Sequence, residues 1–308
     1  MQNRLRTAVA LSFALATSVP TSHAFTRAET KVEQRIDTKE RNEAVKEQLL
    51  RTDGLMREYA AKRTAGCRTP MDVARRLFDG ISGYGNGKLT REGITADAQR
   101  TFYLKRGFCS SQSYLFIALF NERMKALGLK AAAHLCEIYR NSNSYLTIPH
   151  VAVAVTEGDH TVIFDPALNR VIDRQLNPIA AHVLGDNGVV SNHFINLAAV
   201  ADGKGDHTRA EAYARKAVVT EPKSAFAHCM LAQYLAENGK FEEARKEAET
   251  VIKLAPTWPN GYTELAHILD KLGLTEEEFE VLHRKVQVMP KESQDFKAYL
   301  KEIGYRTE

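Results

Sequence analysis

The stretch that decides the fold is HVAVAVTEGDHTVIFD, residues 150–165. Two runs rich in valine, isoleucine and phenylalanine stand on either side of a short polar segment with a glycine, which is the composition of two β-strands joined by a tight turn. A two- or four-residue loop at this point pairs residues whose numbers sum to 317. The sequence therefore predicts an antiparallel hairpin.

The loop length also decides which polar side chains share a face of the hairpin. With an even loop, His150 faces position 167, and Asp165 lies one diagonal step away on the same face, within reach of the imidazole. A three- or five-residue loop would send the two side chains to opposite faces. Since a carboxylate orients an imidazole that acts as a base, we expect His150 to be a general base and Asp165 to orient it if the loop is even.

A nucleophile for this pair stands upstream, where Cys109 opens an apolar segment. The apolar residues recur at three- and four-residue steps and Gly128 supplies a stop, so the sequence predicts a helix of about five turns. Gly107 is expected to let the backbone turn sharply into this helix. A helix N-terminus and a nearby imidazole both lower the pKa of a thiol. Cys109, His150 and Asp165 are therefore the candidate catalytic residues, as nucleophile, base and orienting carboxylate.

Acyl chemistry also needs donors for the oxyanion. The backbone N–H of Cys109 is the expected first donor because it lies at a helix start. A side-chain donor could come from Gln99, Tyr103 or Gln112, and the sequence does not choose among them.

The three motifs GFC (107–109), PHV (149–151) and FDP (164–166) resemble the transglutaminase-like superfamily of papain-like thiol enzymes, over about residues 67–180. The two hairpin strands are also similar to the protein-glutaminase branch, whose members deamidate glutamine side chains in proteins. The resemblance implies an α+β core in which a helix packs on an antiparallel sheet. One feature departs from it: the tryptophan that many relatives carry near the histidine or aspartate is missing, since Trp258 lies far downstream. Substrate choice therefore stays open.

The C-terminal third repeats with a period of 34 residues. The repeating positions are Pro222, Pro256 and Pro290, then Gly205, Gly239 and Gly273, then Leu197, Leu231 and Leu265, each followed by alanine. This period resembles that of the tetratricopeptide repeat, a helix-turn-helix unit. We expect the glycines to make the turns within each unit and the prolines to end the second helices.

These patterns predict an α+β papain-like or transglutaminase-like core joined to an all-α solenoid of tetratricopeptide repeats. A second amphipathic helix is expected from Met71 to Asp79, ended by Gly80. The expected segments are a signal peptide at 1–24, a charged helical arm at 25–66 that is either packed or partly flexible, the catalytic domain at 67–187, three repeats at 188–290 and a capping helix at 291–308.

The N-terminus predicts export. Arg4 and Arg6 precede an apolar run, and Ser22-His23-Ala24 offers the small residues that a signal peptidase reads, so cleavage near Ala24 is expected. The run is shorter than the roughly twenty residues that span a bilayer. We expect a periplasmic or secreted protein without a membrane anchor.

Composition narrows the partners and cofactors. The 308 residues carry a net charge of +4, which requires neither nucleic acid nor a polybasic membrane surface. The ten histidines are scattered and no C-x-x-C motif occurs, so we expect no metal and no cofactor. An oxidising compartment would permit a disulfide between Cys67 and Cys136, and Cys229 is expected to be a small packed residue.

Two classes of function remain. In the first, the protein is a thiol enzyme that acts on an amide of a protein or peptide through an acyl-Cys109 intermediate: hydrolysis, glutamine deamidation or amine transfer. Its repeats would then bind the substrate or a partner protein, or brace the core. In the second, the core is catalytically silent and the repeats act as an adaptor.

Overall fold

The protein is represented by a computed structural model that describes residues 38–82, 96–139, 150–173 and 181–288. It divides into two compact units, which are described separately. None of the helices in the described ranges is long and apolar enough to cross a membrane. The expected signal peptide and the expected capping helix lie outside the described residues.

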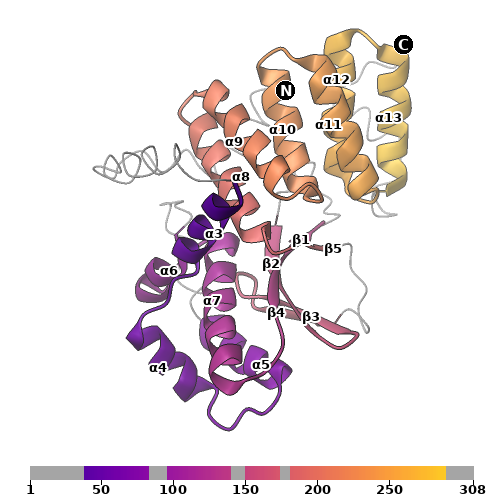
Figure 1. Ribbon diagram of the computed structural model, residues 1–308. Helices are drawn as coiled ribbons and strands as arrows, with labels where there is room; N and C mark the ends of the chain where they lie inside the picture. Colours follow the sequence, from indigo (N-terminus) through magenta and orange to yellow (C-terminus); the bar gives the residue numbers. More distant parts are fainter. Residues whose placement is uncertain (1–37, 83–95, 140–149, 174–180, 289–308) are drawn as a thin grey trace. The chain divides into compact units, whose positions relative to one another are not determined.

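The first unit combines helices with most of a small antiparallel sheet (Figure 1). Its helices are α3 (Thr38–Leu49), α4 (Gly54–Arg63), α5 (Pro70–Ile81), α6 (Ala98–Leu104) and α7 (Cys109–Leu127). The strands are β1 (Ala133–Ile138), β2 (His150–Glu157), β3 (His160–Asp165), β4 (Arg170–Asp173) and β5 (Ala181–Val183), in the spatial order β4-β3-β2-β1-β5.

The hairpin has the predicted register. Strand β2 pairs antiparallel with β3 from Val153 opposite Phe164 to Glu157 opposite His160, so the paired numbers sum to 317. The loop is the two-residue one, and its Gly158 has a φ of 60°, in the left-handed region that favours glycine. Residues 151–155 and 162–165 are all buried, which explains why these strands are apolar throughout instead of alternating.

Helix α7 is the central element of this unit. It begins at Cys109 and ends at Leu127, with Gly128 as a left-handed C-cap, so the predicted helix and its stop are confirmed. Every residue from 110 to 120 is buried, which means that the helix is covered on all sides. The ring of Phe116 stacks on Phe164 of β3 with centroids 5.4 Å apart, and this contact attaches α7 to the sheet.

The prediction for the second amphipathic helix is wrong at its end. Helix α5 continues through Gly80 to Ile81 instead of stopping at the glycine. A Cβ at this position would collide with the hydroxyl of Tyr59 and lie 2.8 Å from Nε of Arg63, both on α4. Gly80 is therefore an interior residue of α5 and not a helix terminator, and the atoms that its Cβ would meet are the ends of two long side chains.

The described part of the charged N-terminal segment forms α3 and α4. Met56 and Ala60 on α4 are completely buried, so this helix belongs to the core of the first unit. This segment was expected to be either packed helices or a partly flexible arm, and residues 38–63 fit packed helices.

Three successive helix pairs follow, all in the second unit apart from residues 188–193 of α8: α8 (Gly188–Asp202) with α9 (His207–Thr220), α10 (Ala225–Glu237) with α11 (Phe241–Leu254), and α12 (Pro259–Leu272) with α13 (Thr275–Val288). Gly205, Gly239 and Gly273 have φ values of 76°, 75° and 73° and lie in the turns within the pairs. Pro222 and Pro256 each follow the last residue of a second helix by two positions. The predicted roles of these residues are confirmed, and Pro290 lies outside the described residues.

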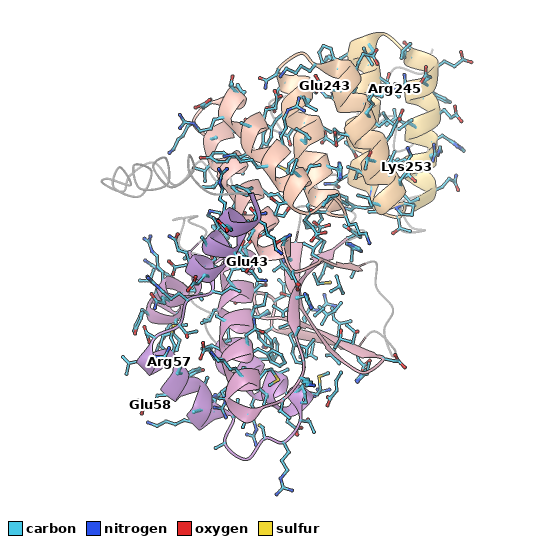
Figure 2. The ribbon with its side chains drawn as sticks, in the orientation of Figure 1. Glu43, Arg57, Glu58, Glu243, Arg245 and Lys253 are labelled. Carbon is cyan, nitrogen blue, oxygen red and sulfur yellow. The ribbon has the colours of Figure 1, made fainter. Side chains whose placement is uncertain are left out.

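The second helices of the pairs are linked by ion pairs. Arg215 of α9 donates to Glu243 of α11 at 2.7 Å, and Arg245 of α11 donates to Glu277 of α13 at 2.8 Å. Figure 2 shows Glu243 and Arg245 on α11. The two glutamates are one repeat apart, whereas the two arginines are 30 positions apart, so only the acceptor has the period of the solenoid. Partly exposed pairs of this kind contribute about 0.2–1 kcal/mol each, less than the packing of the helices.

Trp258 belongs to the core of the second unit. It is completely buried, and its ring centroid lies 5.0 Å from that of Phe226 and 5.4 Å from that of Tyr139. The only tryptophan is therefore used in packing.

A buried carboxylate caps the second repeat. Glu137, which is 1% exposed, accepts hydrogen bonds from the Ser224 hydroxyl, from the Tyr139 hydroxyl at 2.8 Å and from the backbone N–H of Ala225 at 3.1 Å, at the start of α10. Burial raises the pKa of Glu137 to about 7, and the hydrogen bonds oppose this rise without cancelling it.

This pKa predicts a pH-dependent stability. The folded state holds the Glu137 proton more tightly than the unfolded chain does. The stabilisation of the fold by this proton is therefore fully present below the ordinary glutamate pKa of 4.5 and is lost as pH rises through about 7. Glu137→Gln removes this titration. The stability of the variant relative to wild type should therefore rise by about 3 kcal/mol between pH 4.5 and 8.

Urea unfolding of both proteins across this range measures the difference, in which the titration of groups that do not interact with Glu137 cancels. That includes Glu264, whose pKa burial also raises to about 7. A difference that does not change with pH would contradict the prediction.

Candidate functional site

Cys109 is the first residue of α7 and is half-buried. The preceding residue, Phe108, is the N-cap and makes no side-chain capping hydrogen bond, while its carbonyl accepts from the N–H of Gln112 at 3.0 Å. The first turn carries no acidic side chain. The positive end of the helix dipole therefore meets the thiol without a competing carboxylate in that turn, an arrangement that favours a thiolate.

Gly107 is needed for a different reason from the one the sequence suggested. Its φ lies outside the left-handed region, so the φ at this position does not by itself require glycine. Instead, a Cβ at this position would lie 2.7 Å from Cβ of Ser111 and 3.4 Å from Cγ2 of Thr101. Ser111 is itself held in place, because its Oγ accepts from the N–H of Ala96 at 2.9 Å. Gly107 thus allows the segment before Cys109 to lie directly against α7.

The three oxyanion candidates occupy different surroundings. The Tyr103 hydroxyl donates to Oδ2 of Asp53 at 2.6 Å, a contact that lowers the pKa of Asp53 and raises that of Tyr103. Its proton is therefore engaged by the residue that caps α4.

The two glutamine candidates lie on neighbouring helices. Gln99 is half-buried on α6. Gln112 is buried on α7, and its Nε2 donates to the carbonyl of Gly107 at 2.9 Å. Of the three, Gln112 is the residue with a hydrogen bond to the segment that leads into Cys109.

His150 and Asp165 lie at the same end of the hairpin, because His150 begins β2 and Asp165 ends the antiparallel strand β3. The Asp165 side chain is completely buried, and its Oδ1 accepts from the N–H of Leu168 at 3.2 Å in the turn that follows. His150 is half-buried. Cys109 and Asp165 belong to the first unit, whereas His150 falls at the edge of the second.

The loop of the hairpin satisfies the condition on which the role of Asp165 depends. It has two residues, and an even loop keeps His150 and Asp165 on the same face when the register is continued toward the start of β2. An imidazole with a carboxylate beside it can remove a proton from a thiol and later return it to a leaving amine.

The disulfide that the sequence permits between Cys67 and Cys136 is absent from the structure. Cys67 carries a free thiol, so the permitted disulfide to Cys136 is not formed. Cys229 is buried on α10, and burial raises the pKa of its thiol well above the usual value. Cys229 is thus the packed residue that the sequence predicted.

Comparisons with known proteins identify the repeat region. The model of the tetratricopeptide repeat family matches residues 225–258, which cover α10 and α11. Among solved structures, the chain is similar to the crystal structure of MamA at 18% identity and a TM-score of 0.32, over 38% of this chain and 70% of that one. A likeness at this TM-score supports no conclusion about this chain. No curated protein matches the sequence.

One group of polar residues escaped the sequence analysis. Asp202, His207 and Glu237 come together at the junction of the first two helix pairs, although no metal-ligand spacing is visible in the sequence. Asp202 and Glu237 end the first helices of successive repeats, and His207 begins the helix between them. The repeat period could have indicated this group, because it predicts that the ends of the first helices in successive repeats stack on each other.

Proposed function

We propose that this protein is a periplasmic or secreted cysteine-dependent enzyme that acts on an amide of a protein or peptide, and that its repeats bind a protein partner or the substrate. The observation that carries the proposal is the two-residue hairpin loop, because it meets the condition under which Asp165 can orient His150. Further support comes from the position of Cys109 at the start of α7. The sequence resemblance to transglutaminase-like enzymes points to the same chemistry.

The proposed reaction follows from the properties of these groups. His150 takes the thiol proton, the Cys109 thiolate attacks the carbonyl carbon, and the backbone N–H at the helix start stabilises the oxyanion. The C–N bond then breaks, and the departing amine takes the proton from the imidazolium. Water or an amine resolves the acyl-Cys109 thioester. Hydrolysis, glutamine deamidation and transfer to an amine differ only in the acyl group and in this last reactant.

Thiol reactivity tests the enzyme proposal. We expect iodoacetamide at neutral pH to alkylate Cys109 much faster than Cys67, which is also half-buried and carries a free thiol. Cys229 should react slowest because its thiol is buried. Site-resolved mass spectrometry over time gives the rates. If Cys109 reacts no faster than Cys67, the thiol is not activated and the enzyme proposal fails.

A second candidate is a catalytically silent adaptor. The match of residues 225–258 to the tetratricopeptide repeat supports its protein-binding part, because such repeats indicate a protein-binding role whether or not the core is active. The two candidates differ in product formation. A screen of proteins and peptides by mass spectrometry, reading cleavage, deamidation and crosslinks separately, should give at least one product with wild type if the chain is an enzyme and none if it is an adaptor.

A further inference from the structure

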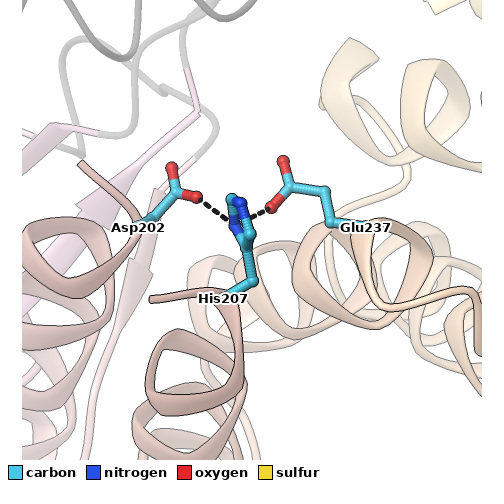
Figure 3. Close-up of side chains that lie close together, drawn as sticks. All are labelled: Asp202, His207 and Glu237. Carbon is cyan, nitrogen blue, oxygen red and sulfur yellow. Dashed lines mark hydrogen bonds and ion pairs between the residues drawn. The ribbon is translucent and has the colours of Figure 1, made fainter. Parts of the chain in front are cut away.

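The cluster of Asp202, His207 and Glu237 lies within the second unit and joins its first two helix pairs. Figure 3 shows the two carboxylates on either side of the imidazole. Nδ1 of His207 lies 3.0 Å from Oδ1 of Asp202 and 3.4 Å from Oε2 of Glu237. The three donor atoms all lie within 4.8 Å of one another.

Both carboxylates approach the same nitrogen. Nδ1 can carry only one proton: its contact with Asp202 is a hydrogen bond of 3.0 Å, whereas the 3.4 Å contact with Glu237 is an ion pair only when the imidazole is protonated. A cation can bind Nδ1 of His207 and one oxygen of each carboxylate at the same time. Around a cation with bonds of about 2.1 Å, neighbouring ligand atoms lie about 3.0 Å apart in an octahedron and about 3.4 Å apart in a tetrahedron. The 3.0 Å separation has the octahedral value and the 3.4 Å separation the tetrahedral one, so both lie in the range of ligand atoms that share a cation, without selecting one geometry.

An independent observation comes from Tyr234 on α10. Its side chain is completely buried, yet its hydroxyl has no hydrogen-bond partner in the part of the chain that the structure describes. Burial is the main cause of its raised pKa, and the charges of Asp202 and Glu237 add to it, so the hydroxyl lies within electrostatic reach of the two carboxylates. Buried hydroxyls normally have a partner. A water molecule bound to a cation between the carboxylates would supply one.

We propose that Asp202, His207 and Glu237 bind a divalent transition-metal cation, with Zn²⁺ as the best match, and that Tyr234 contacts the remaining ligand position through water. One imidazole and two carboxylates are ligands that suit Zn²⁺, whereas Mg²⁺ and Ca²⁺ favour oxygen ligands alone. The cation would link the end of α8 and the start of α9 to the end of α10, and so would stabilise the stacking of the first two repeats.

Titration of the metal-free full-length protein with ZnCl2 tests the proposal. Calorimetry should show one Zn²⁺ bound per chain and no binding of Mg²⁺, and the thermal midpoint should rise with the zinc concentration. His207→Ala should weaken zinc affinity at least about 100-fold. The side chain is 46% exposed at the start of α9, so this variant should fold. Asp202→Asn combined with Glu237→Gln keeps the shapes of the side chains and should cause a similar loss.

A matched control lies in the first unit. His160 contacts Asp173 at 2.9 Å with similar exposure but has no third ligand in the described residues, and His160→Ala should leave zinc affinity unchanged. Tyr234→Phe removes only the hydroxyl, so it should weaken zinc binding about tenfold without lowering the midpoint of the metal-free protein. The proposal is overturned if wild type binds no zinc or if the His207 variant binds it as tightly as wild type. Unchanged affinity in Tyr234→Phe removes Tyr234 from the site.

Discussion

Cys109→Ala is expected to abolish turnover of any amide substrate identified by the screen, with a loss in kcat/KM on the order of several thousandfold or more. The reason is that the covalent step has no other nucleophile when the thiol is replaced by a methyl group. Folding should be nearly unaffected. The first backbone bond of α7 joins Phe108 and Gln112 and does not involve the side chain at position 109, and alanine is the best helix former.

The matched control is Cys67→Ala, which removes the free, half-buried thiol and should leave kcat/KM at the wild-type value. The measurement combines initial rates with the thermal midpoint of each variant, since an unchanged midpoint separates lost chemistry from lost structure. A Cys109→Ala protein that keeps a substantial share of the wild-type rate would remove Cys109 from the mechanism. It would leave the adaptor as the better description of the chain.

The elements that could be predicted from the sequence are those fixed by local patterns. The hairpin register followed from two apolar runs and a glycine turn, and α7 followed from its periodicity and from Gly128. The repeats followed from a period that three turn glycines share. In each case the decisive residues are close in the sequence or recur at a constant interval, so no knowledge of tertiary contacts was needed.

The errors concern residues whose neighbours come from another element. Gly80 was interpreted as a stop signal but lies inside α5, and at Gly107 the space of a Cβ is occupied by Ser111 of α7. In the same way, the hydrogen bond from Tyr103 to Asp53 joins residues 50 positions apart. Sequence alone could therefore propose Tyr103 as an oxyanion donor without showing that its proton is engaged. A local pattern contains no information on such packing.

The metal-ligand cluster illustrates the same limit in the repeats. Asp202 and His207 are close in the sequence, but Glu237 joins them only through the stacking of one helix pair on the next. A search for short ligand spacings misses a site of this kind. A search that compares equivalent turns of consecutive repeats would find it.

His150→Ala is expected to be nearly as damaging as Cys109→Ala, whereas the loss in Asp165→Asn should be about two orders of magnitude smaller. Without the imidazole, no base removes the thiol proton and no acid protonates the departing amine. Asparagine keeps the shape of the aspartate and loses only the charge that stabilises the imidazolium. Its side-chain oxygen can still accept from the N–H of Leu168, so the turn after β3 should be preserved.

The dependence of kcat/KM on pH adds a readout that a purely structural role would not change. Removing the Asp165 charge should lower the pKa of the imidazolium, because a nearby carboxylate favours the charged form. The acid limb of the profile should therefore move to lower pH in Asp165→Asn. Asp173→Asn is the control: this carboxylate contacts His160, a different histidine, and its loss should leave both rate and profile as in wild type. If Asp165→Asn proves harmless, then Asp165 does not orient His150, and another polar group must hold the base.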